Sequence, residues 1–205
     1  DLPGTSFENA EIQIPSLKTA ESGPLLITHW GLSGPAVLKI SAWEARTLAE
    51  LKYQFEIEVN FISIPISEAE NLLKTFKTQN PKKSIGQSKI FNVTNRFWNK
   101  VLEICNINPE KQIANISAKE LNAILEALCR KKMQVTGKSI YKDEFVTAGG
   151  VDLWEVDFKD MESKLLPNFY ICGEVLNIDA ITGGFNFQAC WSEAWLISQK
   201  LNTNS

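Results

Sequence analysis

Hydrophobic and polar residues alternate in the first part of the chain. Within residues 10–15, Ile12 and Ile14 fall on one side, which is the pattern of a half-buried strand. A short apolar run at residues 25–28 ends in a turn-rich stretch and predicts a second strand. Alternation returns at residues 55–64, where the odd-numbered positions from 55 to 61 are apolar. These patterns predict a β-rich first segment.

The stretch between the last two strands has helical spacing. Apolar side chains recur from Ala36 to Ala45, and the helix is predicted to continue to about Glu50. Ser33 is a candidate N-terminal cap, because its hydroxyl can accept a hydrogen bond from a free backbone amide. Pro35 suits the first turn, where the amide that proline lacks has no helical partner.

The middle of the chain is predicted to be helical. Ser-x-x-Glu capping boxes at residues 67–70 and 117–120 each predict the start of a helix. Between them, residues 95–105 place apolar side chains at helical spacing. Asn-Pro pairs at residues 80–81 and 108–109 separate the three helices, because proline disfavours helical backbone at the residue before it.

Strands are predicted again in the last third. Residues 146–151 read as a strand that ends in a glycine turn, and residues 169–172 as a short, fully buried strand. Gly183 and Gly184 then precede a final helix at residues 187–201.

Composition favours a soluble globular protein. Hydrophobic residues make up 44% and charged residues 22% of the 205 residues. No apolar run reaches the ~18 residues of a membrane-spanning helix, and no leader opens the sequence, so a cytoplasmic protein without membrane contact is expected. The four cysteines form no C-x-x-C pair, which predicts reduced thiols and no metal site.

Charge is unevenly distributed along the chain. Residues 71–138 carry 13 basic and four acidic side chains, a net of +9, whereas the segments on either side are each −6. One run of this segment has only basic charges, interleaved with Phe76, Phe91, Phe97 and Trp98. Two interpretations stay open: the lysines bind RNA phosphates while the aromatics stack on bases, or a solvated face covers an aromatic core. The candidate RNA-binding residues are Lys74, Lys77, Lys82, Lys83, Lys89, Arg96 and Lys100.

One pattern near the C-terminus points to chemistry. A predicted strand ends at Gly173, where the missing side chain lets a ligand approach the backbone, and Glu174 can accept hydrogen bonds from sugar hydroxyls. The pair Gly183 and Gly184 stands at a helix start, whose free amides favour an anion or an electron-rich ring edge. By itself the pattern is equally compatible with a tight turn before an ordinary helix.

Four longer motifs occur in order along the chain. They are GPLLITHWGLSGPA at residues 23–36, VTAGGV at 146–151, MESKL at 161–165 and CGEVLNIDAITGGFN at 172–186. In this order they resemble the aminoacetone-oxidase-like family of bacterial NAD(P)/FAD-dependent oxidoreductases.

The resemblance implies an α+β fold in three parts. Residues 1–66 and 133–145 would form a β-barrel-like insert subdomain, and residues 67–132 a small, basic helical subdomain. Residues 146–205 would supply the C-terminal strands and helix of an FAD domain with a two-dinucleotide-binding flavoprotein fold.

The same resemblance implies FAD as cofactor and NAD(P)H as its reductant, with hydride passing to an unidentified acceptor. Gly173 and Glu174 would meet the ribityl–pyrophosphate region, and Gly149 and Gly150 would turn close to the ring. The isoalloxazine side would be lined by Asp179, Thr182, Gly183, Gly184 and Asn186.

The chain departs from the family pattern in two ways. Ala180 stands where the family has glycine, so the loop after residue 179 is expected to be adjusted. No G-x-G-x-x-G occurs, and the family carries this motif in an N-terminal Rossmann half. That flavin-binding half is expected to be a missing partner, and this chain alone is expected to be inactive and to bind FAD weakly or not at all. A stand-alone RNA-binding module is the alternative.

The single histidine, His29, leaves two interpretations open. It is either a proton donor near a flavin or substrate, or a structural residue at a turn. No residue is singled out as a catalytic acid or base.

Overall fold

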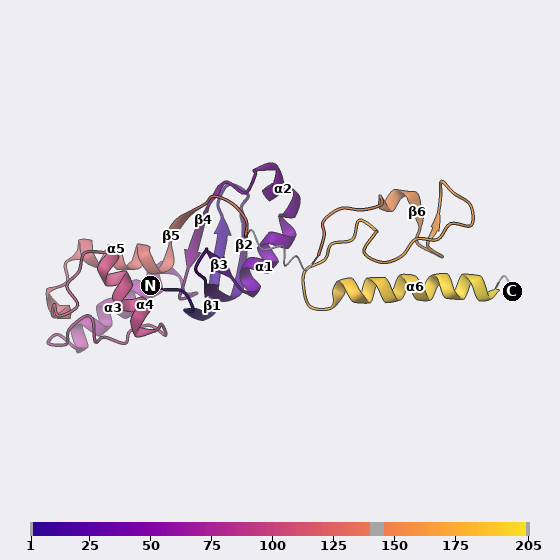
Figure 1. Cartoon of the computed structure of the whole chain (residues 1–205). Helices are drawn as coiled ribbons and strands as arrows, with labels where there is room; N and C mark the ends of the chain where they lie inside the picture. Colours follow the sequence, from indigo (N-terminus) through magenta and orange to yellow (C-terminus); the bar gives the residue numbers. More distant parts are fainter. Residues whose placement is uncertain (1, 140–145, 204–205) are drawn as a thin grey trace. The chain divides into compact units, whose positions relative to one another are not determined.

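The computed structural model describes residues 2–139 and 146–203 (Figure 1). Its internal contacts divide the chain into two compact units. The first unit comprises Asp1–Ile40 and Leu51–Lys138, and the second comprises Ser41–Glu50 and Ser139–Ser205. Residues 140–145, which belong to the predicted return of the chain to the barrel, lie outside the described residues. The predicted subdomain boundaries at residues 66 and 133 stay predictions.

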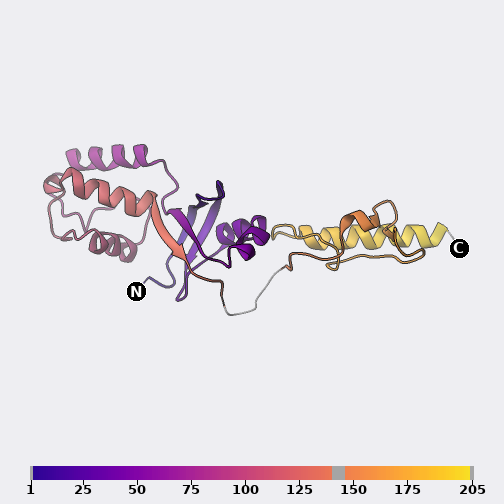
Figure 2. The same cartoon turned by 90° about the horizontal axis from the view of Figure 1, so that it is seen from above.

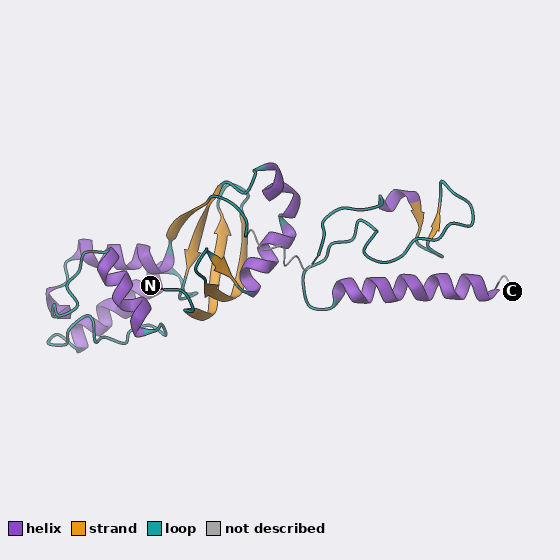
Figure 3. Ribbon diagram, viewed as in Figure 1, coloured by secondary structure: helices purple, strands orange, loops and turns teal. Residues whose placement is uncertain are grey.

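An antiparallel half-barrel sheet forms one part of the first unit (Figure 3). The strand order is β3-β2-β1-β4-β5. Ile12 and Ile14 are almost fully buried, so the predicted alternation is confirmed. With the helices described next, the sheet confirms an α+β fold. The strands are β1 (Ser6–Ile14), β2 (Thr19–Ile27), β3 (Leu32–Ser33), β4 (Phe55–Asn60) and β5 (Lys131–Val135).

Three helices form the other part of the first unit: α3 (Ile66–Gln79), α4 (Asn95–Ile104) and α5 (Ala118–Cys129). Helix α5 lies between α3 and α4 (Figure 2). The predicted capping box of α5 is confirmed, because the Ser117 hydroxyl accepts from the Glu120 amide and the Glu120 carboxylate accepts from the Ser117 amide.

The capping box predicted for α3 is wrong. The helix begins at Ile66, one residue before Ser67, and Pro65 stands at the cap position without a side-chain hydrogen bond. Since Ser67 already lies inside the first turn, its hydroxyl is past the position from which it would accept from a free amide.

An aromatic cluster joins the sheet to the helices. The Phe7 ring of β1 lies 4.8 Å from the Phe97 ring of α4 and 4.9 Å from the Phe61 ring, which follows β4. All three side chains are buried. The indole of Trp98 is also buried and donates to the Ile85 carbonyl at 2.8 Å. The sheet and the helices therefore share one core.

The predicted helix at residues 36–50 is two helices, α1 (Pro35–Trp43) and α2 (Ala45–Glu50). Proline at the first position of α1 agrees with the prediction. Ser33 does not directly precede the helix, because it lies in β3 and Gly34 follows it. Gly34 has φ 104°, and a Cβ there would come within 2.7 Å of the Pro24 carbonyl oxygen, so only glycine suits this corner.

The second unit has a small core around Val156, Met161 and Leu176. Long helix α6 (Phe185–Thr203) belongs to it, and of its described residues only Glu193 is buried. The other elements are short: α2, 3-10 helix η2 (Leu153–Glu155) and the paired strands β6 (Val156–Asp157) and β7 (Glu162–Ser163).

Both strands predicted for this unit are wrong. In residues 146–151 only Val151 forms a bridge, to Leu176, and in residues 169–172 only Tyr170 does, to Glu162. A strand exists only where neighbours satisfy its backbone groups, and each of these segments has a single bridge in the described part of the chain.

Candidate functional site

Two turns of the second unit are tied to helix α6. The Gly173 amide donates to Glu193 Oε2 at 2.7 Å, and Glu193 is only 5% exposed. Because Glu193 lies eight residues into α6, the Gly173 turn is placed ~12 Å along the helix from its start. The turn that contains Gly183 and Gly184 stands at that start. An extended ligand lying along α6 would meet both turns.

Asn186 closes the loop that holds the second turn. Its Oδ1 accepts from the Ala180 amide and its Nδ2 donates to the Ala180 carbonyl, each at 2.9 Å. The loop between them contains Thr182, Gly183 and Gly184, so Asn186 shapes the stretch predicted to face an isoalloxazine. Its amide group makes both hydrogen bonds within the chain itself.

Three of the candidate glycines leave the backbone open. Gly149, Gly173 and Gly184 have φ of 114°, 88° and 92°, in the left-handed region that favours glycine. No atom lies within 4 Å of where a Cβ would stand at any of them. The space that a side chain would fill is therefore open at all three turns.

Gly150 is needed for a different reason. A Cβ there would overlap with the Val175 carbonyl oxygen and with the Leu176 backbone. The neighbouring Val151 amide donates to the Val175 carbonyl at 2.8 Å, and the Asn177 amide donates to the Val151 carbonyl at 3.0 Å. The turn at residues 149–150 thus lies beside the segment that follows Glu174, whose own side chain is exposed.

Arg46 joins the site although nothing near it in the sequence predicted this. Its guanidinium donates to Asn177 Oδ1 at 2.5 Å and lies 3.9 Å from Asp179 Oδ1. The arginine comes from α2, 131 residues before Asn177. Sequence reasoning also missed Glu193, whose only signal is a charged residue on a helix rich in aromatics.

The candidate basic residues have different partners. Arg96 donates to the carbonyls of Leu2 and Pro3 and to the Thr5 hydroxyl, at 2.8 to 3.3 Å, so it holds the N-terminal segment. Lys100 pairs with Glu103 at 2.6 Å. These two are engaged within the chain.

The remaining candidates lie on α3 or in the segment between α3 and α4. Lys74 pairs with Glu70, and Lys77 donates to the Ile116 carbonyl, each at 2.5 Å. Lys83 lies over the Phe76 ring, 5.5 Å from its centre. Lys82 and Lys89 are exposed.

The aromatics interleaved with these lysines do not form a stacking platform. Phe97 and Trp98 are 3% and 4% exposed, and Phe76 and Phe91 are half-buried. The core interpretation is therefore confirmed for Phe97 and Trp98, which have no face open to a base.

His29 lies exposed in the turn between β2 and β3. Its ring centre is 6.3 Å from that of Trp30. It belongs to the first unit, and the candidate flavin residues belong to the second. Among the residues that the structure describes, no three His, Cys, Asp or Glu side chains gather as a metal site. The same part of the chain has no helix long and apolar enough to cross a membrane.

A protein-family model described as the HI0933-like protein barrel and H2TH domain matches residues 1–146. The chain belongs to the HI0933-like family. The match covers the half-barrel sheet and the three helices, and it ends before the glycine turns of the second unit. The narrower aminoacetone-oxidase-like resemblance stays a prediction.

Curated relatives extend the similarity of this HI0933-like chain. It is 31% identical over 198 residues to the ribosomal RNA dihydrouridine synthase of Escherichia coli (strain K12), covering 94% of the chain and 47% of the relative. It is 32% identical over 195 residues to the protein of the same name from Haemophilus influenzae, covering 90% and 45%.

A third relative is the 3-dehydro-bile acid delta(4,6)-reductase of Clostridium scindens. It is 28% identical over 180 residues, covering 86% of the chain and 43% of the relative. The chain therefore spans about half the length of the curated relatives it matches.

Proposed function

We propose that this HI0933-like chain is part of a flavin-dependent oxidoreductase that adds two hydrogen atoms across a carbon–carbon double bond. The carrying observation is the pair of open glycine turns, at Gly173 and Gly184, held along one helix by Glu193 and Asn186. Open backbone at a helix start favours an electron-rich ring edge, and an open turn further along suits the ribityl–pyrophosphate region.

The residues of this chain position the cofactor. Glu193 and Asn186 hold the two turns, Arg46 holds the segment that leads to Asp179, and Glu174 is exposed for sugar hydroxyls. When bound, FAD supplies hydride transfer, with NAD(P)H as its reductant.

The names of the relatives support the class of reaction. Dihydrouridine contains two hydrogens more than uridine, and a delta(4,6)-reductase is named for the double bonds it reduces. Adding a hydride and a proton to an alkene would account for both names, and oxidation of NAD(P)H to NAD(P)⁺ is the proposed source of the hydride. The acceptor of this chain is proposed to be an alkene of this type, and a uridine in RNA is the candidate that the net charge of +9 over residues 71–138 favours.

The surface of the second unit supports a missing partner segment. Trp154 is 85% exposed, and α6 presents Phe187, Trp191 and Trp195 with 64%, 67% and 61% exposure. Several large aromatic side chains exposed on one unit are typical of a surface that a partner covers. We assign it to the N-terminal flavin-binding half, because the chain spans about half of its relatives and its own residues contain no G-x-G-x-x-G.

The test uses the complete reading frame that contains this chain. The purified protein is expected to carry stoichiometric FAD, and NADH or NADPH is expected to bleach its visible absorbance. A full-length protein without bound flavin would overturn the proposal.

Matched glycine variants test the site itself. Gly184→Leu is expected to lower flavin occupancy at least tenfold, because the new side chain fills the open space. Gly31→Leu is the control, since Gly31 is equally open with φ 155° but lies in the first unit. Equal loss of flavin in both variants would refute the assignment of the turn.

A further inference from the structure

A groove separates α3 from the start of α5 in the first unit. It encloses about 450 Å³ and is walled on one side by Lys74, Lys77 and Thr78 of α3. Its lining also includes Pro81, which follows α3, and Ala114, Ala118 and Leu121. The lining thus combines two lysines with apolar side chains.

Further lysines stand next to the groove in the sequence. Lys82 and Lys83 follow the lining residue Pro81, and Lys119 follows the lining residue Ala118. All three side chains are exposed, and among the described residues none of them is in an ion pair with a carboxylate. Lys119 was not among the predicted candidates, because it lies beyond the purely basic run from which they were taken.

The carboxylates near this groove are already neutralised. Glu120 binds Lys111 at 2.7 Å and both polar groups of Ser117, and these hydrogen bonds lower the pKa of its carboxyl to about 2. Glu70 pairs with Lys74 on the exposed surface, where an ion pair contributes little and can be exchanged for another anion.

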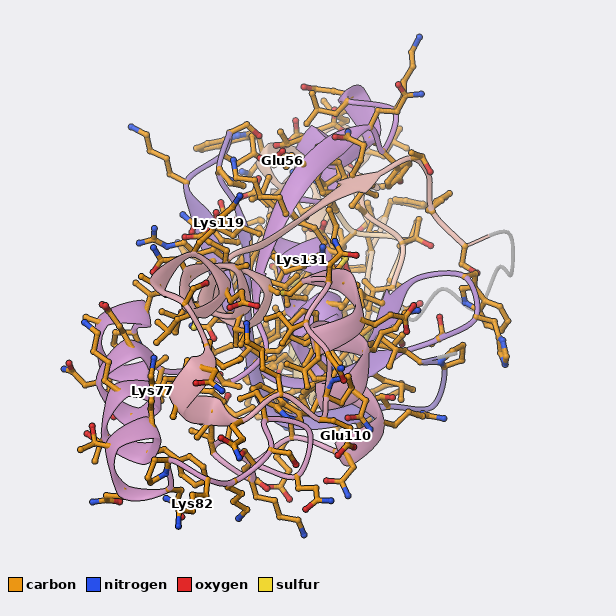
Figure 4. The ribbon with its side chains drawn as sticks, turned by 90° about the vertical axis from the view of Figure 1, so that its left-hand side faces the viewer. Glu56, Lys77, Lys82, Glu110, Lys119 and Lys131 are labelled. Carbon is orange, nitrogen blue, oxygen red and sulfur yellow. The ribbon has the colours of Figure 1, made fainter. Side chains whose placement is uncertain are left out.

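The other side of the helices has the opposite character. A second groove, of about 730 Å³, is lined by amide side chains and by the carboxylates Glu103 and Glu110. In Figure 4, Lys82, Lys77 and Lys119 follow one side of the helical part, and Glu110 lies across from them. A polyanion is therefore favoured on the α3–α5 side only.

We infer that the α3–α5 groove binds the sugar–phosphate backbone of RNA, with Lys82, Lys83 and Lys119 as phosphate contacts. The inference rests on the proposed function, to which it adds the surface that holds a nucleic-acid substrate. Ammonium groups neutralise phosphates without reading bases, so the groove supplies affinity and position rather than sequence. Lys77 contributes charge while its hydrogen bond to Ile116 holds the wall of the groove.

The test measures binding of a fluorescein-labelled RNA hairpin to the full-length protein by anisotropy, over a range of salt concentrations. The groove variant is Lys82→Gln/Lys83→Gln/Lys119→Gln. The control variant, Lys18→Gln/Lys52→Gln/Lys100→Gln, removes the same charge at two exposed positions beside the sheet and one on α4. Circular dichroism checks that both remain folded.

The groove variant is expected to weaken binding at least tenfold near 0.1 M salt. Its slope of log affinity against log salt should fall by about 2 to 3, since each phosphate contact contributes ~0.7 to ~0.9. The control is expected to change affinity less than twofold. Equal weakening in both variants, or none in the groove variant, would overturn the inference.

Two further measurements distinguish RNA from an acidic polypeptide as the ligand, and the groove assignment from the proposed reaction. Polyglutamate at the same charge concentration is expected not to displace the RNA; displacement would show that the groove takes an acidic polypeptide instead. Flavin occupancy is expected to be unchanged in the groove variant. A protein that binds RNA through these lysines but holds no flavin would overturn the proposed reaction and leave the groove assignment standing.

Discussion

The Glu193 carboxylate accepts a hydrogen bond from the Gly173 amide at 2.7 Å, across 20 residues of chain. Glu193 is 5% exposed on a helix whose aromatic side chains face outward. A carboxylate is expensive to bury without a hydrogen-bond partner, and the Gly173 amide supplies one. It links α6 directly to the Gly173 turn.

Two substitutions at Glu193 distinguish the effect of its hydrogen bond from the effect of its charge. Glu193→Leu removes the acceptor and is expected to destabilise the second unit by about 1.5–3 kcal/mol, the usual range for a hydrogen bond to a charged group. Glu193→Gln keeps a carbonyl acceptor and should retain most of the stability and flavin affinity. Urea unfolding and flavin titration of the full-length protein measure both quantities. Equal losses in the two variants would show that charge, not the hydrogen bond, matters.

Two substitutions at Asn186 are expected to loosen the loop of residues 180–186 to different degrees. Asn186→Asp keeps the acceptor for the Ala180 amide but sets a carboxylate oxygen against the Ala180 carbonyl, where the Asn186 amide now donates. Asn186→Ala loses both hydrogen bonds, at about 1 kcal/mol each. Both variants are expected to raise amide hydrogen exchange in residues 180–186, with Asn186→Asp at least as affected as Asn186→Ala. Unchanged exchange would mean that the loop keeps its shape without this side chain.

The capping box of α5 predicts a dependence on pH. Hydrogen bonds from Lys111 and Ser117 lower the pKa of Glu120 from 4.5 to about 2. A lowered pKa means that the folded state favours the ionised form, so this stabilisation is complete above pH 4.5 and is lost as the pH falls toward 2. The free energy of unfolding of the wild-type protein should therefore drop more steeply than that of Glu120→Gln between pH 4.5 and 2. Parallel curves for the two proteins would contradict this.

The aromatic cluster predicts that sheet and helices unfold together. Phe97→Ala leaves a cavity beside Phe7 and Phe61 and is expected to destabilise the first unit by about 3–5 kcal/mol. Strand and helix signals in urea unfolding should shift by the same amount. Separate transitions for the two would show that the helices have a core of their own.

Replacing the exposed aromatic side chains of α6 is expected to have opposite effects in the 205-residue chain and in the full-length protein. In the 205-residue chain, Trp191→Gln/Trp195→Gln is expected to increase solubility and lower binding of a hydrophobic dye, because both indoles are exposed. In the full-length protein the same change should destabilise the fold if the missing half covers α6. Dye binding and thermal unfolding of both proteins measure this. A destabilised chain together with an unaffected full-length protein would place the interface elsewhere.

Local patterns were enough to predict most elements of the first unit. Two examples are the alternation that buries Ile12 and Ile14 and the Ser117–Glu120 capping box. Both depend only on neighbours within a few residues, so the sequence alone predicts them. The glycine pair before α6 is of the same kind, since a helix start needs only local backbone. The cap assigned to Ser67 was wrong because the helix begins one residue earlier, at Ile66, with Pro65 at the cap position.

Long-range contacts decided the rest. Residues 146–151 and 169–172 have the apolar pattern of strands, but a strand needs partners, and their described neighbours supply one bridge each. The contact of Arg46 with Asn177 and the burial of Glu193 depend on segments meeting in space. Likewise, adding Lys119 to the α3 lysines required the packing of α3 against α5. Periodicity constrains which face a residue takes, whereas only the folded chain brings distant side chains within bonding distance.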